Sequence, residues 1–241
     1  MTMIYAHRGA SGYAPENTLE AFELAAKMGA AGVELDVHFC KSGEVVVAHD
    51  EKVDRVSDGE GYIKDMTLKE LKALHFNRIH PEYQNARIPT LEEVYALLKP
   101  AGLLVNVELK TGSIDYTGIE QACVDIAARM GMTQKVLYSS FNHRSLGIVK
   151  NIDASLPCGI LYDTVMFKPW EYAAQNGMNA LHTRLSELRF PDVVPNAHKA
   201  NLEVNPWTVN TPEDIRMCIA AGADRIISNY PDRALEILKN G

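Results

Sequence analysis

Long apolar runs and clustered cysteines are both missing from this sequence of 241 residues. No stretch approaches the roughly 18 apolar residues of a membrane-spanning helix, so we expect no membrane insertion. The chain reaches His7 and Arg8 before an apolar signal segment could form. No CxxC pair is present, and reduced, buried thiols are the expectation for the four cysteines, Cys40, Cys123, Cys158 and Cys218. These absences favour a cytoplasmic protein.

An excess of positive charge is also missing. The 24 Lys and Arg residues face 31 Asp and Glu residues, which gives a net charge of −7. A mildly acidic chain lacks the basic surface that nucleic acids or anionic membranes require, so we expect neither as a partner. The hydrophobic fraction of 46% is ordinary for a globular chain with a sizeable core.

Short β-rich segments alternate with helical segments from one end of the chain to the other. This alternation predicts parallel strands, and the number of units fits a closed (β/α)8 TIM barrel. A doubly wound open sheet is less well supported, because no GxGxxG turn follows the first strand. The expected strands cover residues 3–6, 32–37, 44–48, 103–109, 135–139, 157–161, 180–183, 202–204 and 225–228.

Three helices have recognisable starts. Asn17 with Glu20, and Thr90 with Glu93, follow the capping-box pattern in which the first side chain caps the helix and the second reaches back. Thr211 precedes a proline at the first helical position, which also predicts a helix start.

The alternation is interrupted once, between Asp50 and Pro89. About forty residues is long for a loop between a strand and a helix. We therefore predict a single catalytic barrel domain over residues 1–241, with residues 51–88 inserted after the second strand at one rim.

Carboxylates gather on two of the expected strands. Side chains alternate along a strand, so Glu34 and Asp36 share one face, and Asn106, Glu108 and Lys110 share another. Carboxylates on a buried strand are costly unless a cation or proton neutralises them. The alternatives are a solvated edge strand for the first pair and a simple Glu108–Lys110 ion pair for the second.

Together, Glu34, Asp36 and Glu108 would form a site with three carboxylates. Oxygen ligands of this kind suit one hard divalent cation, Mg²⁺ or Ca²⁺. Zinc sites more often contain His or Cys, so zinc is a weaker expectation.

Other chemically useful side chains follow expected strands, where barrel active sites are built. His7 and His49 would suit a general acid and base near neutral pH, although each taken alone could be structural. Arg8 beside His7 has the planar fork that binds phosphate or carboxylate. Trp207 follows a late strand and is either a core residue or the wall of a pocket for a small polyol.

The combined motifs resemble the glycerophosphodiester phosphodiesterase family. They occur in the family's order from residue 7 to residue 210, so the resemblance covers nearly the whole chain. The matching pieces are His7-Arg8-Gly9, Pro15-Glu16-Asn17-Thr18, Glu34-Leu35-Asp36-Val37, Val46-Val47-Ala48-His49-Asp50, Ile88-Pro89-Thr90-Leu91, Glu108-Leu109-Lys110, Ser140-Phe141 and Trp207-Thr208-Val209-Asn210.

The resemblance implies a (β/α)8 barrel with a small insertion and a metal-dependent hydrolase. The implied substrates are glycerophosphodiesters, such as glycerophosphocholine or glycerophosphoethanolamine, cleaved to an alcohol and sn-glycerol 3-phosphate. It also implies three sets of site residues: metal ligands Glu34, Asp36 and Glu108; an acid/base pair His7 and His49, in which the roles stay open; and phosphate-binding Arg8 and Lys110.

The sequence departs from the family at two places. Ser42 stands where Asp is usual before Gly43, and Asn229 stands where an acid usually follows the last strand. Two other classes stay open: a metal-dependent barrel aldolase or isomerase, and a non-catalytic barrel that binds phosphoesters. A phospholipase D-like relative would act on membrane lipids, which the missing signal peptide and basic face disfavour. The oligomeric state is open, and a homo-oligomer is compatible with the sequence.

Overall fold

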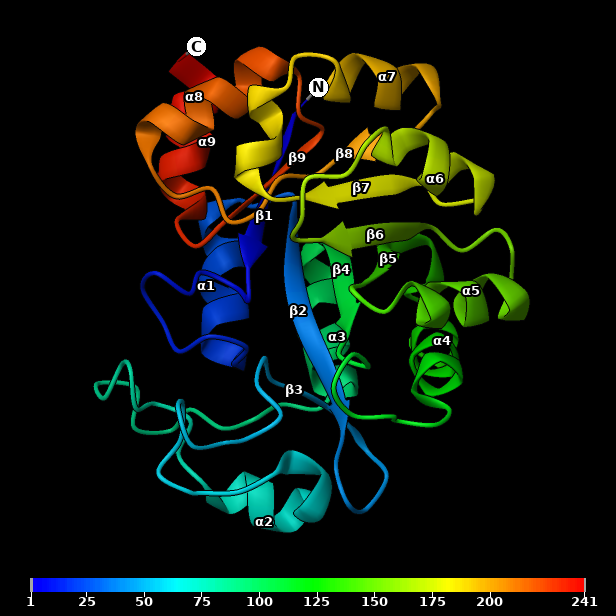
Figure 1. The fold of residues 1–241 in the computed structure, drawn as a ribbon. Coiled ribbons are helices and arrows are strands. Elements are labelled where there is room, and N and C mark those ends of the chain that lie inside the picture. The colour runs from blue at the N-terminus through cyan, green and yellow to red at the C-terminus, as the bar shows by residue number, and fades with distance from the viewer. Residues whose placement is uncertain (1, 241) are drawn as a thin grey trace.

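Eight parallel strands form the wall of a barrel in the computed structural model, which describes residues 2–240 (Figure 1). Around the wall they follow the order β8-β7-β6-β5-β4-β2-β1-β9, and every ladder between neighbours in this order is parallel. The strands are β1 (Met3–His7), β2 (Gly32–Phe39), β4 (Leu104–Leu109), β5 (Val136–Ser140), β6 (Cys158–Tyr162), β7 (Ala180–Thr183), β8 (Glu203–Val204) and β9 (Arg225–Ser228).

The seam between β8 and β9 closes the wall without a regular ladder. The Asp224 amide donates to the Val204 carbonyl at 2.9 Å, and the Ile227 amide donates to the Pro206 carbonyl at 3.1 Å. The Val209 amide in turn donates to the Ile227 carbonyl at 2.9 Å. The predicted TIM-barrel fold is therefore confirmed.

Helices surround the strands (Figure 1). They are α1 (Leu19–Met28), α2 (Leu68–Ala73), α3 (Leu91–Ala101), α4 (Ile119–Arg129), α5 (His143–Ile152), α6 (Pro169–Gln175), α7 (Val193–Lys199), α8 (Pro212–Ala221) and α9 (Pro231–Asn240). Short 3-10 helices cover Ile63–Asp65, Thr133–Lys135 and Leu185–Arg189. The predicted caps at Thr90, with its capping box, and at Thr211 are both present.

The N-cap of α1 lies one residue later than the sequence predicts. Thr18, not Asn17, is the N-cap, and its hydroxyl accepts from the Ala21 amide. Asn17 has a φ of 57° and donates from its side chain to Asp36 at 2.9 Å instead. Because Thr18 already caps α1, the Asn17 side chain is available to donate to the buried carboxylate of Asp36.

The expected strand at residues 44–48 is not a barrel strand. β3 (Val45–Val47) runs antiparallel to the outer end of β2, pairing Val37 with Val47, and lies off the path around the wall. The sequence predicts that His49 follows a barrel strand. That prediction is wrong, because β3 lies outside the wall. A hairpin with β2 carries His49 to the same end of the barrel.

Residues 51–88 lie between β3 and α3, beyond the outer end of β2, and contain α2 (Figure 1). They have a small apolar core of their own, in which Val53, Ile63, Leu71, Phe76 and Ile88 pack against Val46 and Ala48. A capping box between Thr67 and Glu70 starts α2. We call residues 51–88 the rim segment.

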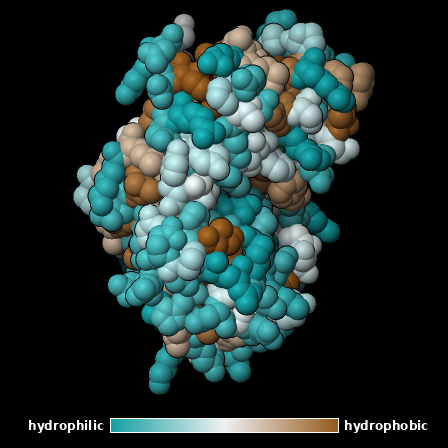
Figure 2. Space-filling model, turned by 90° about the vertical axis from the view of Figure 1, so that its left-hand side faces the viewer, coloured by the Kyte–Doolittle hydropathy of each residue, from teal (hydrophilic) through white to brown (hydrophobic). Residues whose placement is uncertain are grey.

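The face shown in Figure 2 is mostly hydrophilic, and its apolar residues form small, separate groups. Among residues 2–240, no helix is both long and apolar enough to cross a bilayer.

Candidate active site

Three carboxylates meet inside the barrel because β2 and β4 are aligned in parallel register. Glu34 lies opposite Asn106, and Asp36 lies opposite Glu108. The alternate residues Val33 and Leu35 pack outward in the apolar core, which turns the acids inward. One oxygen from each of Glu34, Asp36 and Glu108 lies within 4.8 Å of the others, and all three residues are buried. We call this group the acidic triad.

The acidic triad is electrostatically strained as it stands. Burial, together with the charges of Asp36 and Glu108, raises the pKa of Glu34 well above its usual value. Burial and the charge of Asp36 likewise raise the pKa of Glu108. Burial would also raise the pKa of Asp36, but the charges of Lys110 and Arg8 outweigh it and lower that pKa.

The donor set fits a hard divalent cation. Asp36 Oδ1 is buried and accepts no hydrogen bond from any described residue. A cation beside three carboxylate oxygens would satisfy that atom and remove the repulsion that raises the pKa of Glu34. The group contains no imidazole or thiolate, the ligands typical of zinc sites.

His7 and Arg8 enter the site through a tight turn at the end of β1. Arg8 has a φ of 56° and Gly9 a φ of 79°. A Cβ atom at Gly9 would lie 2.7 Å from the Ala21 backbone, so only glycine fits there. The Arg8 amide donates to Glu34 Oε2 at 3.1 Å, which fixes the turn against the acidic triad.

His7 is held by an amide. Its Nδ1 lies 2.6 Å from Asn229 Oδ1, and its Nε2 lies 3.8 Å from Glu34 Oε2. Since the Asn229 oxygen can only accept, Nδ1 carries the proton and Nε2 presents a lone pair toward the triad. Burial, and next the charge of Arg8, lower the pKa of His7 to about 4.

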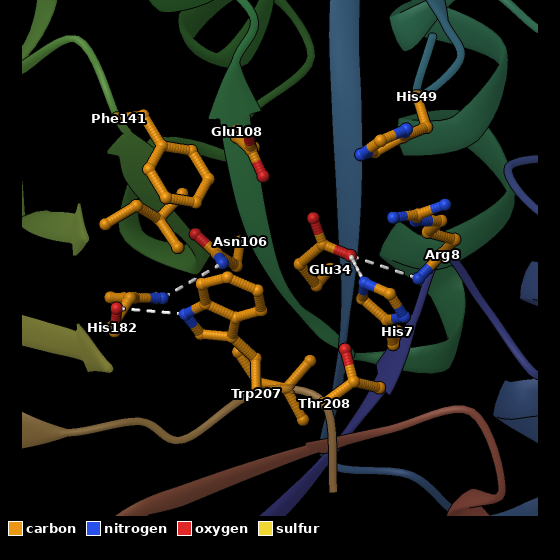
Figure 3. Close-up of a pocket in the computed structure, with 12 residues that line it drawn as sticks. His7, Arg8, Glu34, His49, Asn106, Glu108, Phe141, His182, Trp207 and Thr208 are labelled. Atoms are coloured by element: carbon orange, nitrogen blue, oxygen red, sulfur yellow. Dashed lines mark hydrogen bonds and ion pairs between the residues drawn. The ribbon is translucent and has the colours of Figure 1, made fainter. Parts of the chain in front are cut away.

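His49 is held by a carboxylate. Its Nδ1 lies 2.6 Å from Asp50 Oδ1, and the other oxygen of Asp50 accepts from Arg55 Nε at 2.6 Å. The hydrogen bond with His49, with that of Arg55, lowers the pKa of Asp50. His49 and His7 reach the same cavity from opposite directions (Figure 3).

Two positively charged side chains, Lys110 and Arg8, flank the acidic triad. Lys110 Nζ lies 2.9 Å from Glu108 Oε1 and 3.7 Å from Asp36 Oδ1. Arg8 donates from NH1 to Glu16 at 2.9 Å, and its Nε lies 3.7 Å from Asp36 Oδ2. The Glu108–Lys110 ion pair therefore exists, but within a larger cluster rather than on a solvated strand.

A cavity at the carboxyl ends of the strands is lined by both histidines, Arg8, Glu34 and Glu108. Its far wall is apolar: Trp207 packs edge-to-face on Phe141 with ring centroids 5.6 Å apart (Figure 3). The Trp207 indole donates to the His182 carbonyl at 3.0 Å, which fixes the ring. Trp207 is thus a wall residue rather than a core residue.

Sequence reasoning assigned no role to several residues of the floor and wall. His182 is buried on β7, and its ring fills the space above Gly159, where a Cβ would lie 2.3 Å away. Asn106 lies 3.5 Å from His182 Nδ1. Phe141 and Thr208 also line the cavity. The alternation that marked Glu108 also placed Asn106 on the inner face, and Phe141 and Thr208 belong to two of the motifs that carry the family resemblance.

Comparison with known proteins gives a consistent result. The family model described as the glycerophosphoryl diester phosphodiesterase family matches residues 7–233. A glycerophosphodiester phosphodiesterase of Caldanaerobacter subterraneus is 39% identical, over 100% of this chain and 99% of its own. One of Bacillus altitudinis is 35% identical over 98% of both chains.

Solved structures agree with this result. A phosphodiesterase of Oleispira antarctica, in complex with the product sn-glycerol 3-phosphate, is 29% identical with a TM-score of 0.88, covering 99% of this chain and 97% of that one. The chain belongs to the glycerophosphoryl diester phosphodiesterase family and is a hydrolase of that family.

Proposed function

We propose that the protein hydrolyses glycerophosphodiesters, such as glycerophosphocholine and glycerophosphoethanolamine, to an alcohol and sn-glycerol 3-phosphate in a metal-dependent reaction. The observation that carries the proposal is the arrangement of two histidines and two positively charged side chains around the acidic triad. The product bound by the Oleispira antarctica relative supports the same substrate class.

Glu34, Asp36 and Glu108 would hold one divalent cation, Mg²⁺ or Ca²⁺. Such a cation supplies positive charge that stabilises the negative charge developing on the phosphate. Arg8 and Lys110 each lie 3.7 Å from Asp36 and are suited to hold the non-bridging phosphate oxygens.

The hydrogen-bond partners of the histidines favour different tasks. His7 presents a lone pair on Nε2, so we assign it as the base that accepts the proton of the glycerol 2-hydroxyl. That oxygen forms a bond to phosphorus, and the bond from phosphorus to the alcohol oxygen breaks. His49 instead has the carboxylate of Asp50 as its partner, so we assign it as the acid that protonates the departing alcohol. Water then opens the cyclic phosphate with the two proton transfers reversed.

Specificity should lie in the glycerophosphate half of the substrate. Trp207, with Phe141, forms a wall of the size that a small polyol requires. We expect the alcohol half of the substrate to meet an open side of the cavity, so choline, ethanolamine and glycerol headgroups should all be tolerated.

The test is release of sn-glycerol 3-phosphate from glycerophosphocholine, with Mg²⁺ or Ca²⁺ added and with a chelator. We expect release that the chelator abolishes and the cation restores. Elemental analysis should show metal in the wild-type protein and none in Glu34→Ala. If no headgroup variant is cleaved in a metal-dependent way, the proposal is wrong.

A further inference from the structure

One residue of the rim segment reaches into the network around the catalytic cavity. Arg55 donates from Nε to Asp50 at 2.6 Å, from NH1 to Glu16 at 2.8 Å and from NH2 to Glu16 at 2.7 Å. Asp50 is the partner of His49, and Glu16 is the partner of Arg8. Arg55 therefore joins two carboxylates that each hold a residue of the cavity.

The geometry of this link requires an arginine. The two carboxylates come from different parts of the chain, the turn before α1 and the residue after His49. A guanidinium offers N–H groups in a rigid, planar fork, so it can donate to both at once in one fixed orientation. A lysine has one ammonium on a flexible stem and would hold only one carboxylate firmly.

The link determines how His49 is held. Asp50 has two oxygens: one faces His49 Nδ1 and the other accepts from Arg55. His49 leaves the barrel wall on a hairpin, and no strand of the wall carries it. Its side chain is 32% exposed, so packing alone restrains it weakly. The orientation of Asp50, and through it of His49, then depends on Arg55.

Arg55 matters little for folding. Its side chain is 42% exposed, and surface ion pairs contribute about 0–1 kcal/mol to stability. The rim segment has its own apolar core, which includes Phe76 and Leu71 and which Arg55 does not join. A variant at this position should fold, so that its activity can be compared with that of the wild-type protein.

We infer that Arg55 is a positioning residue, which acts through Asp50 to align His49 for proton donation to the departing alcohol. This inference rests on the proposed function. It makes the rim segment part of the active site, although none of its residues lines the cavity.

The leaving group provides the test. Choline is a poor leaving group that needs a proton from the enzyme, whereas p-nitrophenolate leaves without one. The experiment uses the metal-loaded protein and measures kcat and KM for glycerophosphocholine, and the single-turnover rate constant of p-nitrophenolate release from the glycerol phosphodiester of p-nitrophenol. A single turnover isolates the first step, because opening of the cyclic phosphate uses His49 again with either substrate. The variants are Arg55→Met and Arg55→Lys. Arg87→Met is the matched control, since Arg87 is also in the rim segment but donates only to main-chain carbonyls there.

For Arg55→Met we expect kcat for glycerophosphocholine to fall by about 10²-fold, the cost of a displacement of about 1 Å at a reacting group. For the p-nitrophenyl substrate, the single-turnover rate constant of p-nitrophenolate release should fall by less than about threefold, because this leaving group needs no proton. KM should be nearly unchanged, Arg55→Lys should recover part of the loss, and Arg87→Met should match the wild-type protein.

Two results would overturn the inference. An equal loss in kcat for glycerophosphocholine and in the rate constant of p-nitrophenolate release would mean that Arg55 acts through Arg8 or through the general fold. No change in either would mean that the link is a surface ion pair only. Failure of the proposed function is distinct from either, since the wild-type protein would then cleave neither substrate.

Discussion

The two sides of the acidic triad hold their histidines in different ways. On the β1 side, His7 is 15% exposed and hydrogen-bonded to the neutral amide of Asn229, which follows β9 in the barrel wall. On the β3 side, His49 is 32% exposed and hydrogen-bonded to the carboxylate of Asp50, which the rim segment steadies through Arg55. The same residue type thus has a neutral amide as its partner on one side and a carboxylate on the other, and the proposed roles of base and acid rest on this difference.

The largest effect is expected from a change in the acidic triad, which the two sides share. Glu34→Gln keeps the shape of the side chain but weakens the cation site. We expect kcat to fall by at least about 10³-fold on glycerophosphocholine and on the p-nitrophenyl substrate alike. In metal-free protein near pH 7, burial and two neighbouring acids raise the pKa of Glu34, so its charged form costs stability that Gln does not.

The melting temperature of metal-free Glu34→Gln should therefore exceed that of the metal-free wild-type protein, as calorimetry in chelator would show. A lower melting temperature would contradict the electrostatic strain described for the acidic triad.

Replacing each histidine separately tests the difference directly. His7→Ala should lower kcat by about 10²–10⁴-fold on both substrates, because the attacking hydroxyl needs a base in either reaction. His49→Ala should cause a loss of that size on glycerophosphocholine and a much smaller loss in the single-turnover release of p-nitrophenolate. Steady-state kinetics with the first substrate and single-turnover kinetics with the second would check this, and the reverse pattern would exchange the two roles.

A smaller effect is expected from Asn229→Leu. Leucine has a similar shape but cannot accept the hydrogen bond from His7 Nδ1, so the ring loses its fixed orientation. We expect kcat to fall by about tenfold, equally on both substrates. Ser42→Asp is the control, since it alters the other departure from the family pattern, in an exposed turn. A loss confined to glycerophosphocholine would show that Asn229 serves proton donation instead.

The smallest effect is expected at the start of α2 in the rim segment. Thr67→Ala removes the cap whose hydroxyl accepts from the Glu70 amide and should cost about 1 kcal/mol of the free energy of unfolding. Chemical denaturation would measure this change. Catalysis should be unaffected on both substrates, because the segment acts on His49 through Arg55. A loss of kcat here would show that the whole segment matters to the β3 side.

Much of the β1 side could be predicted from the sequence. Alternation along β2 and β4 placed Glu34, Asp36 and Glu108 on inner faces, because side chains in a strand must alternate. The carboxyl ends of parallel strands then bring these acids and His7 together. The barrel and most of its strand bounds follow from the same short-range patterns.

The β3 side could be predicted only in part. Nothing in the alternation of residues 44–48 shows that β3 turns back on β2 rather than joining the wall, since a short apolar run fits either arrangement. Arg55 meets Glu16 across 39 positions of sequence, and that contact depends on how the rim segment folds back. The Asn17 side chain likewise serves Asp36, a buried partner that no local pattern reveals.

The central claim is that the two histidines have different hydrogen-bond partners at Nδ1, and that the amide of Asn229 leaves His7 with a free lone pair on Nε2. An NMR spectrum of the protein with ¹⁵N-labelled histidine at pH 7 would resolve the two ring nitrogens of His7. Burial lowers the pKa of His7 to about 4, so the ring should be neutral at pH 7, and Asn229 should keep its proton on Nδ1. A His7 ring protonated on Nε2, or on both nitrogens, would contradict the account.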